Sequence, residues 1–408
     1  MYLCIDMKCF FASVECVERG LNPMTTPLVV ADEGRGKGAL CLAVSPYLKE
    51  QGIKNRGRLY EIPQISYLIA KPRMKKYIEY AVLIHRIFLR YVDALDIHTY
   101  SIDEAFLDVS SYLHLYHSVG ELAFRIVEDI YKELGLTATC GAGDNLYLAK
   151  LSLDLIAKKK APYFHYLSLD EFYKTIWYHN NLKDIWQIGS GIKKRLNAMK
   201  LYTLHDIAMS DVEILKKEFG VIGLDLYEHA WGIDHTTIAD IKAYEPISKS
   251  ISRHQILFKD YSKEEAWIPL LEMLFVLSMD LISKEILIQT ISFYIGYGYH
   301  QSSYHKTFSL DFYTDDFYVM KEELKKQYTH VLEGKIRRIG ITFSGIISKN
   351  KDPNTLFYVK NEKQERLNRT ILSVWEKHGK NQLVIGTALC KESTLYVRNN
   401  QIGGHNRE

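Results

Sequence analysis

Two neighbouring acids inside an apolar stretch are the residues of this sequence best placed to do chemistry. Asp103 and Glu104 lie in "TYSIDEAFLDVS", residues 99–110, whose other side chains are mostly good strand formers. Adjacent carboxylates repel each other, and burying them without partners is costly. Because side chains alternate across a strand, both acids can face one point only if a turn or bulge precedes them, and Ser101 could help form such a hairpin.

A third acid, Asp6, ends a second predicted strand in "YLCID", residues 2–6. Carboxylates that meet at neighbouring strand ends have raised pKa values unless a cation compensates them, and Mg²⁺ prefers carboxylate and carbonyl oxygens as ligands. Two such ions about 3.5–4 Å apart support in-line phosphoryl transfer, in which one activates the attacking hydroxyl and the other holds the triphosphate. We therefore predict a two-Mg²⁺ site with Asp6, Asp103 and Glu104 as its catalytic acids. The alternative is that Asp103 and Glu104 are exposed at a hairpin tip.

The surrounding pattern predicts an α+β fold in the first half of the chain, with helices covering one face of a largely antiparallel sheet. After the strand at 2–6, "FFASVECVERG" has helical spacing, and a small strand–turn–strand unit follows. An amphipathic helix is predicted over 71–95, ahead of the two acids, and another helix is ended by Gly135. The strand "LTATCGAG" and a helix ending in three lysines complete this part.

The second half is predicted to contain short helices, a linker and one further α+β domain. Short helices are expected over 168–235 and a charged linker over 236–246. Residues 246–348 then have a β-α-β-β-α-β pattern, and residues 352–408 form a tail with one helix near 361–378.

The composition indicates a globular protein. Of the 408 residues, 47% are hydrophobic and 25% are charged, and the formal net charge of +3 does not by itself demonstrate a polyanionic partner. No apolar run reaches the roughly 18 residues that span a membrane, and the N-terminus lacks signal-peptide features, so a cytoplasmic protein is expected. The six cysteines match no zinc pattern, and we expect reduced, buried thiols rather than the metal site that Cys4, Cys9 and Cys16 weakly suggest.

Five motifs in a fixed order resemble those of the Y-family DNA polymerases. They are "IDMKCFFASVE" (5–15), "LAVSPYLKEQGI" (42–53), "YSIDEAFLDVS" (100–110), "LAKLSLDLIAKK" (148–159) and "KIRRIGITFS" (335–344). The chain is most similar to the UmuC-type translesion branch of Gram-positive bacteria and their mobile elements, and the resemblance covers nearly all of it. It implies a right-hand-like polymerase with a palm (1–18 and 71–165), small fingers (19–70), a helical thumb with a helix-hairpin-helix (166–235), a little finger (247–350) and a C-terminal tail (351–408).

The resemblance implies a role for each acid in the active site. Asp6 and Asp103 would bridge both metal ions, and Glu104 would complete the site of the ion that activates the primer 3′-hydroxyl. The main-chain carbonyl of Met7 would ligate the ion on the nucleotide side.

Further residues are implied to bind the incoming nucleotide. Phe11 matches the steric gate, an aromatic residue below the sugar that leaves no room for a 2′-hydroxyl, and its neighbour Phe10 is expected to pack inward beside it; a Phe-Phe pair could equally be plain core. Lys158 and Lys49 match residues that hold the triphosphate, although Lys158 could also complete a helix macrodipole. Pro46 stands where many relatives have a Tyr, so that phosphate contact is absent.

Two regions are implied to hold primer-template DNA. In residues 185–208, Gly189 and Gly191 would let main-chain N–H groups approach a phosphate, with Lys193 and Lys194 following on the next helix; a bare helix-helix turn is the alternative. In the little finger, a strand rich in cations suits phosphate contacts that position DNA without reading its sequence, and a solvated basic edge strand is the alternative. The cations of that strand are Lys335, Arg337 and Arg338.

The tail departs from the family pattern. Relatives carry a Gln-Leu-x-Leu-Phe peptide for the sliding clamp, whereas this chain has "DPNTLFYV". Leu356 and Phe357 could be the hydrophobic plug of such a peptide, but Pro353 replaces its Gln and Asn354 its first Leu. A clamp contact is therefore expected to be weak or absent.

The resulting hypothesis is an error-prone DNA-dependent DNA polymerase that uses dNTPs in translesion synthesis, in a DNA-damage (SOS) response. Two other classes are compatible with part of the pattern. A nucleotidyl cyclase has similar acids at strand ends but needs neither a helix-hairpin-helix nor a basic β-domain. A non-catalytic DNA- or clamp-binding regulator would not need Asp6, Asp103 and Glu104.

Overall fold

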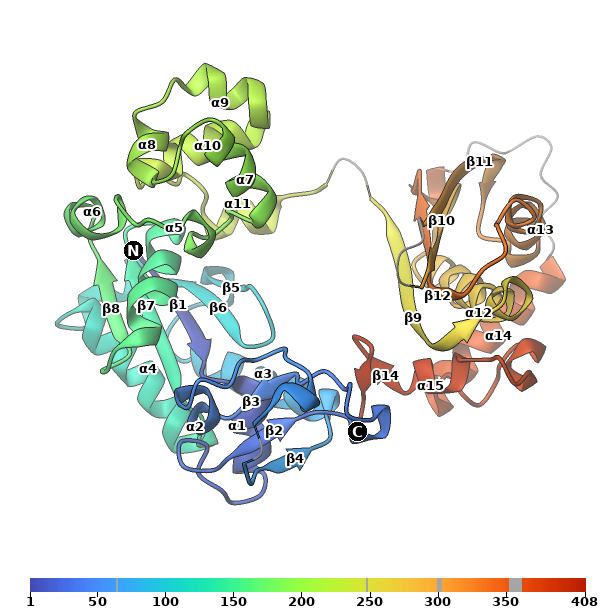
Figure 1. The fold of residues 1–408 in the computed structure, drawn as a ribbon, viewed down its shortest axis with the longest axis horizontal. Coiled ribbons are helices and arrows are strands. Elements are labelled where there is room, and N and C mark those ends of the chain that lie inside the picture. Colours follow the sequence, from blue (N-terminus) through green and yellow to red (C-terminus); the bar gives the residue numbers. More distant parts are fainter. Residues whose placement is uncertain (64, 247–248, 299–302, 352–361) are drawn as a thin grey trace. The chain divides into compact units, whose positions relative to one another are not determined.

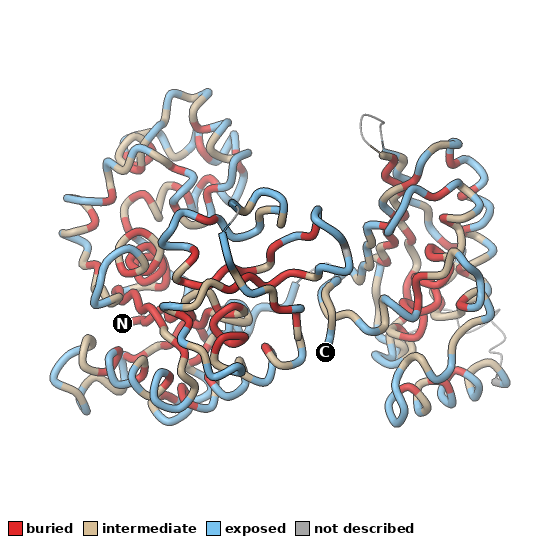
Figure 2. Tube along the Cα trace, turned by 60° about the horizontal axis from the view of Figure 1, so that its bottom comes forward, coloured by how far each residue is buried: buried red, intermediate tan, exposed pale blue. Residues whose placement is uncertain are grey.

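The chain folds into two units. The computed structural model describes residues 1–408 apart from 64, 247–248, 299–302 and 352–361. By their contacts, Met1–Tyr244 together with Asn406–Glu408 form unit 1, and Glu245–His405 form unit 2. Figure 2 shows that the buried residues of each unit concentrate along the strands and on the inner sides of the helices.

A five-stranded sheet in unit 1 carries the predicted acids. Its order is β5-β6-β1-β7-β8, with β1 in the centre, and its neighbouring strands are antiparallel except for β7 and β8 (Figure 1). The strand predicted around the two acids is a hairpin of two strands, while the other two predicted strands are confirmed. The five strands are β1 (Tyr2–Met7), β5 (Ile97–Thr99), β6 (Glu104–Asp108), β7 (Ala138–Gly143) and β8 (Phe164–Leu167).

Side chains of β1 alternate between two helical layers. Leu3 and Ile5 belong to a core that includes residues of α1, α3 and α4, whereas Cys4 packs with residues of α5 and α11 on the opposite face. Because the period of a strand is two, Asp6 shares the face of Cys4. The acid at the end of β1 therefore lies on the α5 side of the sheet. The helices of both layers are α1 (Phe10–Val17), α3 (Met74–Phe88), α4 (Val119–Leu134), α5 (Leu146–Leu151) and α11 (Ile238–Ala243).

The helix over the acids changes its winding. After α5 the chain continues as a π-helix, Ser152–Ile156, and a 3₁₀ turn, Ala157–Lys159, where one regular helix was predicted. We call residues 146–159 the α5 segment. It lies directly on β7, because a Cβ on Gly141 would come within 2.3 Å of Leu153 N and one on Gly143 within 2.5 Å of Ala149 N. Glycine at both positions permits this close approach.

The expected fingers, residues 19–70, contain a small three-stranded sheet of order β3-β2-β4. Ser45 caps α2 by accepting a hydrogen bond from Leu48 N, and Pro46 occupies the first turn, where its missing N–H costs nothing. The elements are β2 (Leu28–Val30), β3 (Ala43–Val44), β4 (Leu68–Ala70), α2 (Pro46–Glu50) and 3₁₀ turns at Glu33–Arg35 and Leu59–Glu61.

The expected thumb, residues 166–235, is helical and has its own core around Phe172, Leu196 and Leu215. Its elements are α6 (Leu169–Glu171), a π-helix (Phe172–Ile176), a 3₁₀ turn (Leu182–Asp184), α7 (Ser190–Ala198), α8 (Leu204–Ala208), α9 (Val212–Phe219) and α10 (Val221–Ala230). Further 3₁₀ turns of unit 1 lie at Ala94–Asp96 and Ser110–Leu115.

The expectation of a linker over 236–246 is wrong for residues 238–243, which form α11. Thr237 and Asp240 form a capping box at its start, and Ile238 is buried against the five-stranded sheet. The charges of this stretch hid the isoleucine that packs on the sheet and the helix cap before it. The division between the units follows Tyr244.

Unit 2 has the predicted β-α-β-β-α-β order. Its sheet runs β11-β10-β12-β9 and is antiparallel throughout, with β13 (Ile347–Ser348) paired to the start of β10. One face packs on the two helices, and the other carries mainly polar side chains. The elements are β9 (Ile251–Tyr261), α12 (Lys263–Ser283), β10 (Ile286–Tyr297), β11 (Tyr304–Thr314), α13 (Phe317–Tyr328) and β12 (Ile336–Ser344), followed by a 3₁₀ turn at Lys349–Lys351.

Helix α12 is long and apolar enough to cross a membrane, contrary to the expectation that no stretch of the chain is. Its most apolar 18-residue window has a mean hydropathy of 1.6, but 72% of that window is buried inside the protein. The helix packs against the sheet, α13 and the C-terminal tail, so its hydropathy is that of a core helix.

Part of the C-terminal tail completes the core of unit 2. Phe275 on α12 makes an edge contact with Trp375 on α14, and Glu272, fully buried, accepts hydrogen bonds from Ser393 Oγ and, at 3.2 Å, from Thr394 N. Burial raises the pKa of Glu272, and the two donors offset part of that effect. The tail elements are α14 (Glu362–His378), a 3₁₀ turn (Gly386–Leu389), α15 (Leu395–Asn399), β14 (Gln401–Ile402) and β15 (His405–Asn406).

We expect Trp375→Ala to destabilise unit 2 by about 3–5 kcal/mol, because it removes a large buried ring and leaves a cavity against α12. Leu389→Ala is the matched control, since Leu389 belongs to the same tail but is 83% exposed. Calorimetric unfolding of the full chain measures both variants. Equal transition temperatures for the two variants would show that the tail does not contribute to the core.

Candidate active site

The turn between β5 and β6 sets the position of Asp103. Tyr100 N and Ser101 N both donate to the carbonyl of Glu104 at 3.0 Å, which closes the hairpin. Ser101 Oγ donates to Asp103 Oδ1 at 2.6 Å, and Met7 N donates to the carbonyl of Asp103 at 2.9 Å. The prediction of a turn just before the acids, with Ser101 taking part, is confirmed. Asp103 therefore lies in the turn, while Glu104 is the first residue of the strand.

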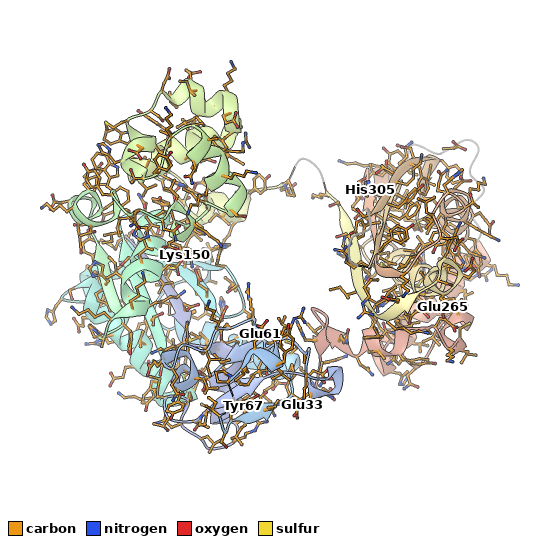
Figure 3. The ribbon with its side chains drawn as sticks, in the orientation of Figure 1. Glu33, Glu61, Tyr67, Lys150, Glu265 and His305 are labelled. Atoms are coloured by element: carbon orange, nitrogen blue, oxygen red, sulfur yellow. The ribbon has the colours of Figure 1, made fainter. Side chains whose placement is uncertain are left out.

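Asp6 and Glu104 lie directly opposite each other on β1 and β6. Their side chains are 18% and 8% exposed, and both point to the α5 side of the sheet, where lysines meet them. Lys158 Nζ lies 3.2 Å from Asp6 Oδ2, and Lys150 Nζ lies 2.6 Å from Glu104 Oε1. The alternative of two acids exposed at a hairpin tip is thus excluded for Glu104. Figure 3 labels Lys150 where the α5 segment crosses the sheet.

Burial and neighbouring charges shift the pKa values of Asp6 and Lys158. Burial raises the pKa of Asp6 to about 6, with the charges of Asp103 and Glu104 adding to the shift and Lys158 opposing it. Burial lowers the pKa of Lys158, but its ion pairs with Asp6 and Asp154 outweigh burial and raise that pKa overall. Lys158 therefore offsets only part of the cost of burying the Asp6 carboxylate, and a further cation beside it would offset more.

Compensation by a divalent cation fits the chemistry of this donor set. Asp6, Asp103 and Glu104, whose carboxylate oxygens are hard donors, lie at one strand end, and Met7 follows Asp6 there. Within the described part of the chain, no three His, Cys, Asp or Glu side chains are already grouped closely enough to hold a metal ion. The positive charge beside Asp6 and Glu104 comes instead from Lys158 and Lys150.

The two phenylalanines of α1 have different surroundings. Phe11 is half-buried and stacks on Tyr77 with ring centroids 4.5 Å apart, whereas Phe10 is 2% exposed and lies in the core. The expectation that Phe10 packs inward is confirmed. Its predicted nucleotide contact would have to come from its main chain, because the ring is covered by the core. Lys49 is exposed at the end of α2.

The predicted helix-hairpin-helix places its glycines in open space. A Cβ on Gly189 or Gly191 would meet nothing within 4 Å, and the φ of −76° at Gly189 suits any residue. The packing of the protein therefore gives no reason for glycine at these positions, as expected if an external group approaches the backbone. Lys194 is exposed beside them, while Lys193 Nζ donates to Asn181 Oδ1 at 2.7 Å.

The basic strand of unit 2 is partly exposed. Lys335 and Arg338 are exposed, and Arg337 lies 3.8 Å from Asp260. The helix-free face of the same sheet has a shallow pocket that sequence reasoning missed, although the polar-apolar alternation of the strands could have indicated it. The pocket is lined by His254, Ser292, Phe293, Tyr294, His305, Gly340 and Thr342. The residues expected for clamp binding, Leu356 and Phe357, lie outside the described residues.

Sequence reasoning also missed Lys150 and Asp154. Asp154 lies between the two lysines, with Oδ1 2.8 Å from Lys158 Nζ and Oδ2 3.1 Å from Lys150 Nζ. The four-residue spacing of these three charged residues was visible in the sequence. Residues four apart are neighbours on a helix face, so the spacing indicated that the three side chains lie together, but not that they face Asp6 and Glu104.

We expect the contribution of Asp6 to the free energy of unfolding to fall as pH rises from about 4 to about 6, because the folded state binds the proton of Asp6 more tightly than the unfolded chain, whose usual pKa is 3.8. In wild type, this contribution to the free energy of unfolding should differ by about 1–3 kcal/mol between pH 4 and pH 6, and Asp6→Asn should remove the difference. Urea unfolding in metal-free buffer measures it, with Asp108→Asn at the far end of β6 as the control. Parallel pH profiles for wild type and Asp6→Asn would contradict the assignment.

The chain matches known proteins along most of its length. Residues 5–154 match the model of the impB/mucB/samB family, and residues 248–356 match that of the impB/mucB/samB family C-terminal domain. A Bacillus subtilis (strain 168) protein named "Putative UV-damage repair protein UvrX" is 33% identical over 99% of this chain and 97% of its own length. A second protein of that strain, named "DNA polymerase IV 2", is 27% identical over 98% of this chain and 97% of its own.

A solved structure has the same fold. It is a Y-family DNA polymerase chimera with a TM-score of 0.62 and 23% identity, and the match covers 85% of this chain and 99% of that one. The two family models together match more than half of the residues, and a relative that is a third identical spans nearly the whole chain. This chain belongs to the impB/mucB/samB family and has the fold of a Y-family DNA polymerase.

Proposed function

We propose that this chain is a DNA-dependent DNA polymerase that carries out error-prone translesion synthesis from dNTPs. The observation that supports this best is the position of Asp6 opposite Glu104 on adjacent strands, with Asp103 in the turn beside them and Lys158 over them. Relatives named as a UV-damage repair protein and as DNA polymerase IV support the same activity. Work in a bacterial cytoplasm and in the response to DNA damage is part of this proposal.

The acids would hold the metal ions on which this family depends. Asp6, Asp103, Glu104 and the carbonyl of Met7 would bind two Mg²⁺ ions, which supply charge stabilisation at the transferred phosphate and activation of the primer 3′-hydroxyl. Burial raises the pKa of Asp6 to about 6 and the charges of Asp103 and Glu104 add to the shift, so a cation bound beside these acids would stabilise their ionised forms.

The remaining residues of the site would bind and select the nucleotide. Lys158 and Lys49 would hold the triphosphate, and Phe11, fixed by its stack on Tyr77, would exclude a 2′-hydroxyl from below the sugar. The small fingers would enclose the nascent base pair only loosely. Discrimination would then depend mainly on base-pairing energy, which admits damaged bases and lowers fidelity.

DNA would be held through its phosphates. The open glycines at 189 and 191 with Lys193 and Lys194, and the cations Lys335, Arg337 and Arg338 on unit 2, suit contacts that position the duplex without reading sequence. Binding to a sliding clamp through Leu356 and Phe357 would be weak, because the surrounding sequence departs from the usual peptide.

Replacing Asp103 or Glu104 is expected to abolish primer extension. Asp103→Asn and Glu104→Gln should each lower the rate on the order of a thousandfold, because each removes a metal-binding charge without changing side-chain size. DNA affinity should persist, and Asp108→Asn on the same strand should extend normally. Primer extension on undamaged and lesion-bearing templates measures the rate. Retained extension in either variant would remove the assignment, and cyclic nucleotide formed without template would favour a cyclase instead.

We expect Phe11→Ala to raise ribonucleotide incorporation relative to deoxyribonucleotide by about 10–200-fold, the range for one small group admitted into a pocket. Single-nucleotide insertion with matched rNTP and dNTP measures the ratio. Phe124→Ala, which removes an exposed phenylalanine from α4, is the control. A ratio equal to that of wild type would show that another residue selects the sugar.

A further inference from the structure

Five charged groups alternate in sign across the active site. Starting from Asp6, the row continues through Lys158, Asp154 and Lys150 to Glu104, with neighbouring atoms 3.2, 2.8, 3.1 and 2.6 Å apart. We call this row the charge ladder. Its two ends are the acids on β1 and β6, and its three middle groups come from the α5 segment. Three carboxylates and two ammonium groups leave the ladder with an excess negative charge.

The three middle groups lie on one face of the α5 segment. They follow one another in four-residue steps, and residues four apart are neighbours on a helix surface. Because Gly141 and Gly143 let the helix rest on β7, its charged face reaches the strand end that carries the acids.

The two lysines differ in freedom. The Lys150 side chain is 7% exposed and is enclosed by Glu104, Asp154 and the ring of Tyr100, whose centroid is 5.6 Å away. The Tyr100 hydroxyl in turn accepts a hydrogen bond from Trp186 at 3.1 Å. Lys158 is 31% exposed and is bound on one side by Asp6 and on the other by Asp154. Lys150 is therefore fixed, while Lys158 can release Asp6 without losing every partner.

From this geometry we propose that Lys150 and Asp154 are positioning residues: Lys150 fixes Glu104, and Asp154 retains Lys158 when it exchanges Asp6 for the phosphates of a nucleotide. The inference rests on the proposed function, since it assigns Lys158 to the triphosphate. Neither positioning residue touches substrate. Lys150 acts through the orientation of an acid at the reacting hydroxyl, and Asp154 acts through the lysine at the nucleotide.

The two roles affect different kinetic constants: kcat in one variant and the KM for dNTP in the other. Lys150→Met keeps the apolar stem but frees Glu104, so we expect kcat to fall about 10–100-fold with little change in the KM for dNTP. Asp154→Asn leaves Lys158 without its second partner, so we expect that KM to rise about tenfold with kcat nearly unchanged. Lys150→Arg keeps the charge and should restore most of kcat. Lys159→Met, at an exposed neighbouring lysine, is the control.

Metal binding to the DNA-free protein provides a readout that does not depend on catalysis. Removing the positive charge beside Glu104 should make Lys150→Met bind Mn²⁺ about tenfold more tightly, as followed by electron paramagnetic resonance. Tighter Mn²⁺ binding with slower chemistry is not expected from general loss of structure. Unchanged Mn²⁺ affinity, equal effects on kcat and KM in both variants, or no restoration by Lys150→Arg would overturn the proposal.

The test separates this inference from the proposed function. If wild type and Lys159→Met extend primers but the split between kcat and KM is absent, the ladder roles are wrong while the polymerase assignment stands. If neither extends any primer, the polymerase assignment fails, and the Mn²⁺ titration of Lys150→Met still decides whether Lys150 holds Glu104 by its charge.

Discussion

The hydrogen-bond register between β1 and β6 is the constraint on which the active site depends. It places Asp6 opposite Glu104, and the turn before Glu104 adds Asp103 to the same strand end. Such a register brings like charges together, and only opposite charge can make the arrangement tolerable. Burial raises the pKa of Asp6 to about 6 even with Lys158 beside it, and the neighbouring acids add to the shift. Strand pairing thus creates a group of acids that a bound cation would stabilise.

The protein supplies positive charge through lysines of the α5 segment. Backbone features at some distance from the acids bring that segment close to the sheet. The glycines of β7 remove the side chains that would hold the α5 segment away from the sheet, and the four-residue spacing of Lys150, Asp154 and Lys158 keeps them on one face of that segment. Cys4 adds a thiol that donates to Glu104 at 3.2 Å. Substituting a glycine in β7 would therefore affect the electrostatics of the site as well as packing.

Much of this arrangement was predictable from residue types and spacing. Adjacent acids in a strand pattern predicted the turn at Ser101, the motif around Phe11 predicted an inward Phe10, and the apolar alternation of unit 2 predicted its β-α-β-β-α-β order. The charge ladder was not predicted, because the spacing of Lys150, Asp154 and Lys158 does not show toward what their helix face points, which depends on tertiary packing. Helix α11 was missed because one buried isoleucine and a capping box among charged residues resemble a linker.

Helix α12 shows how a long apolar helix can be covered by the rest of its own unit. One side of it packs on the sheet of unit 2, and its other side, with Phe275, Val276 and Met279, is covered by the tail elements that follow residue 361. The family model ends at residue 356, before those elements begin. A shortened polypeptide that ended there would expose the apolar side of α12. It would also leave the Glu272 carboxylate without the hydrogen bonds that Ser393 and Thr394 donate. Self-association of such a fragment would result from the exposed apolar side of α12 and would not be a property of the full-length protein's surface.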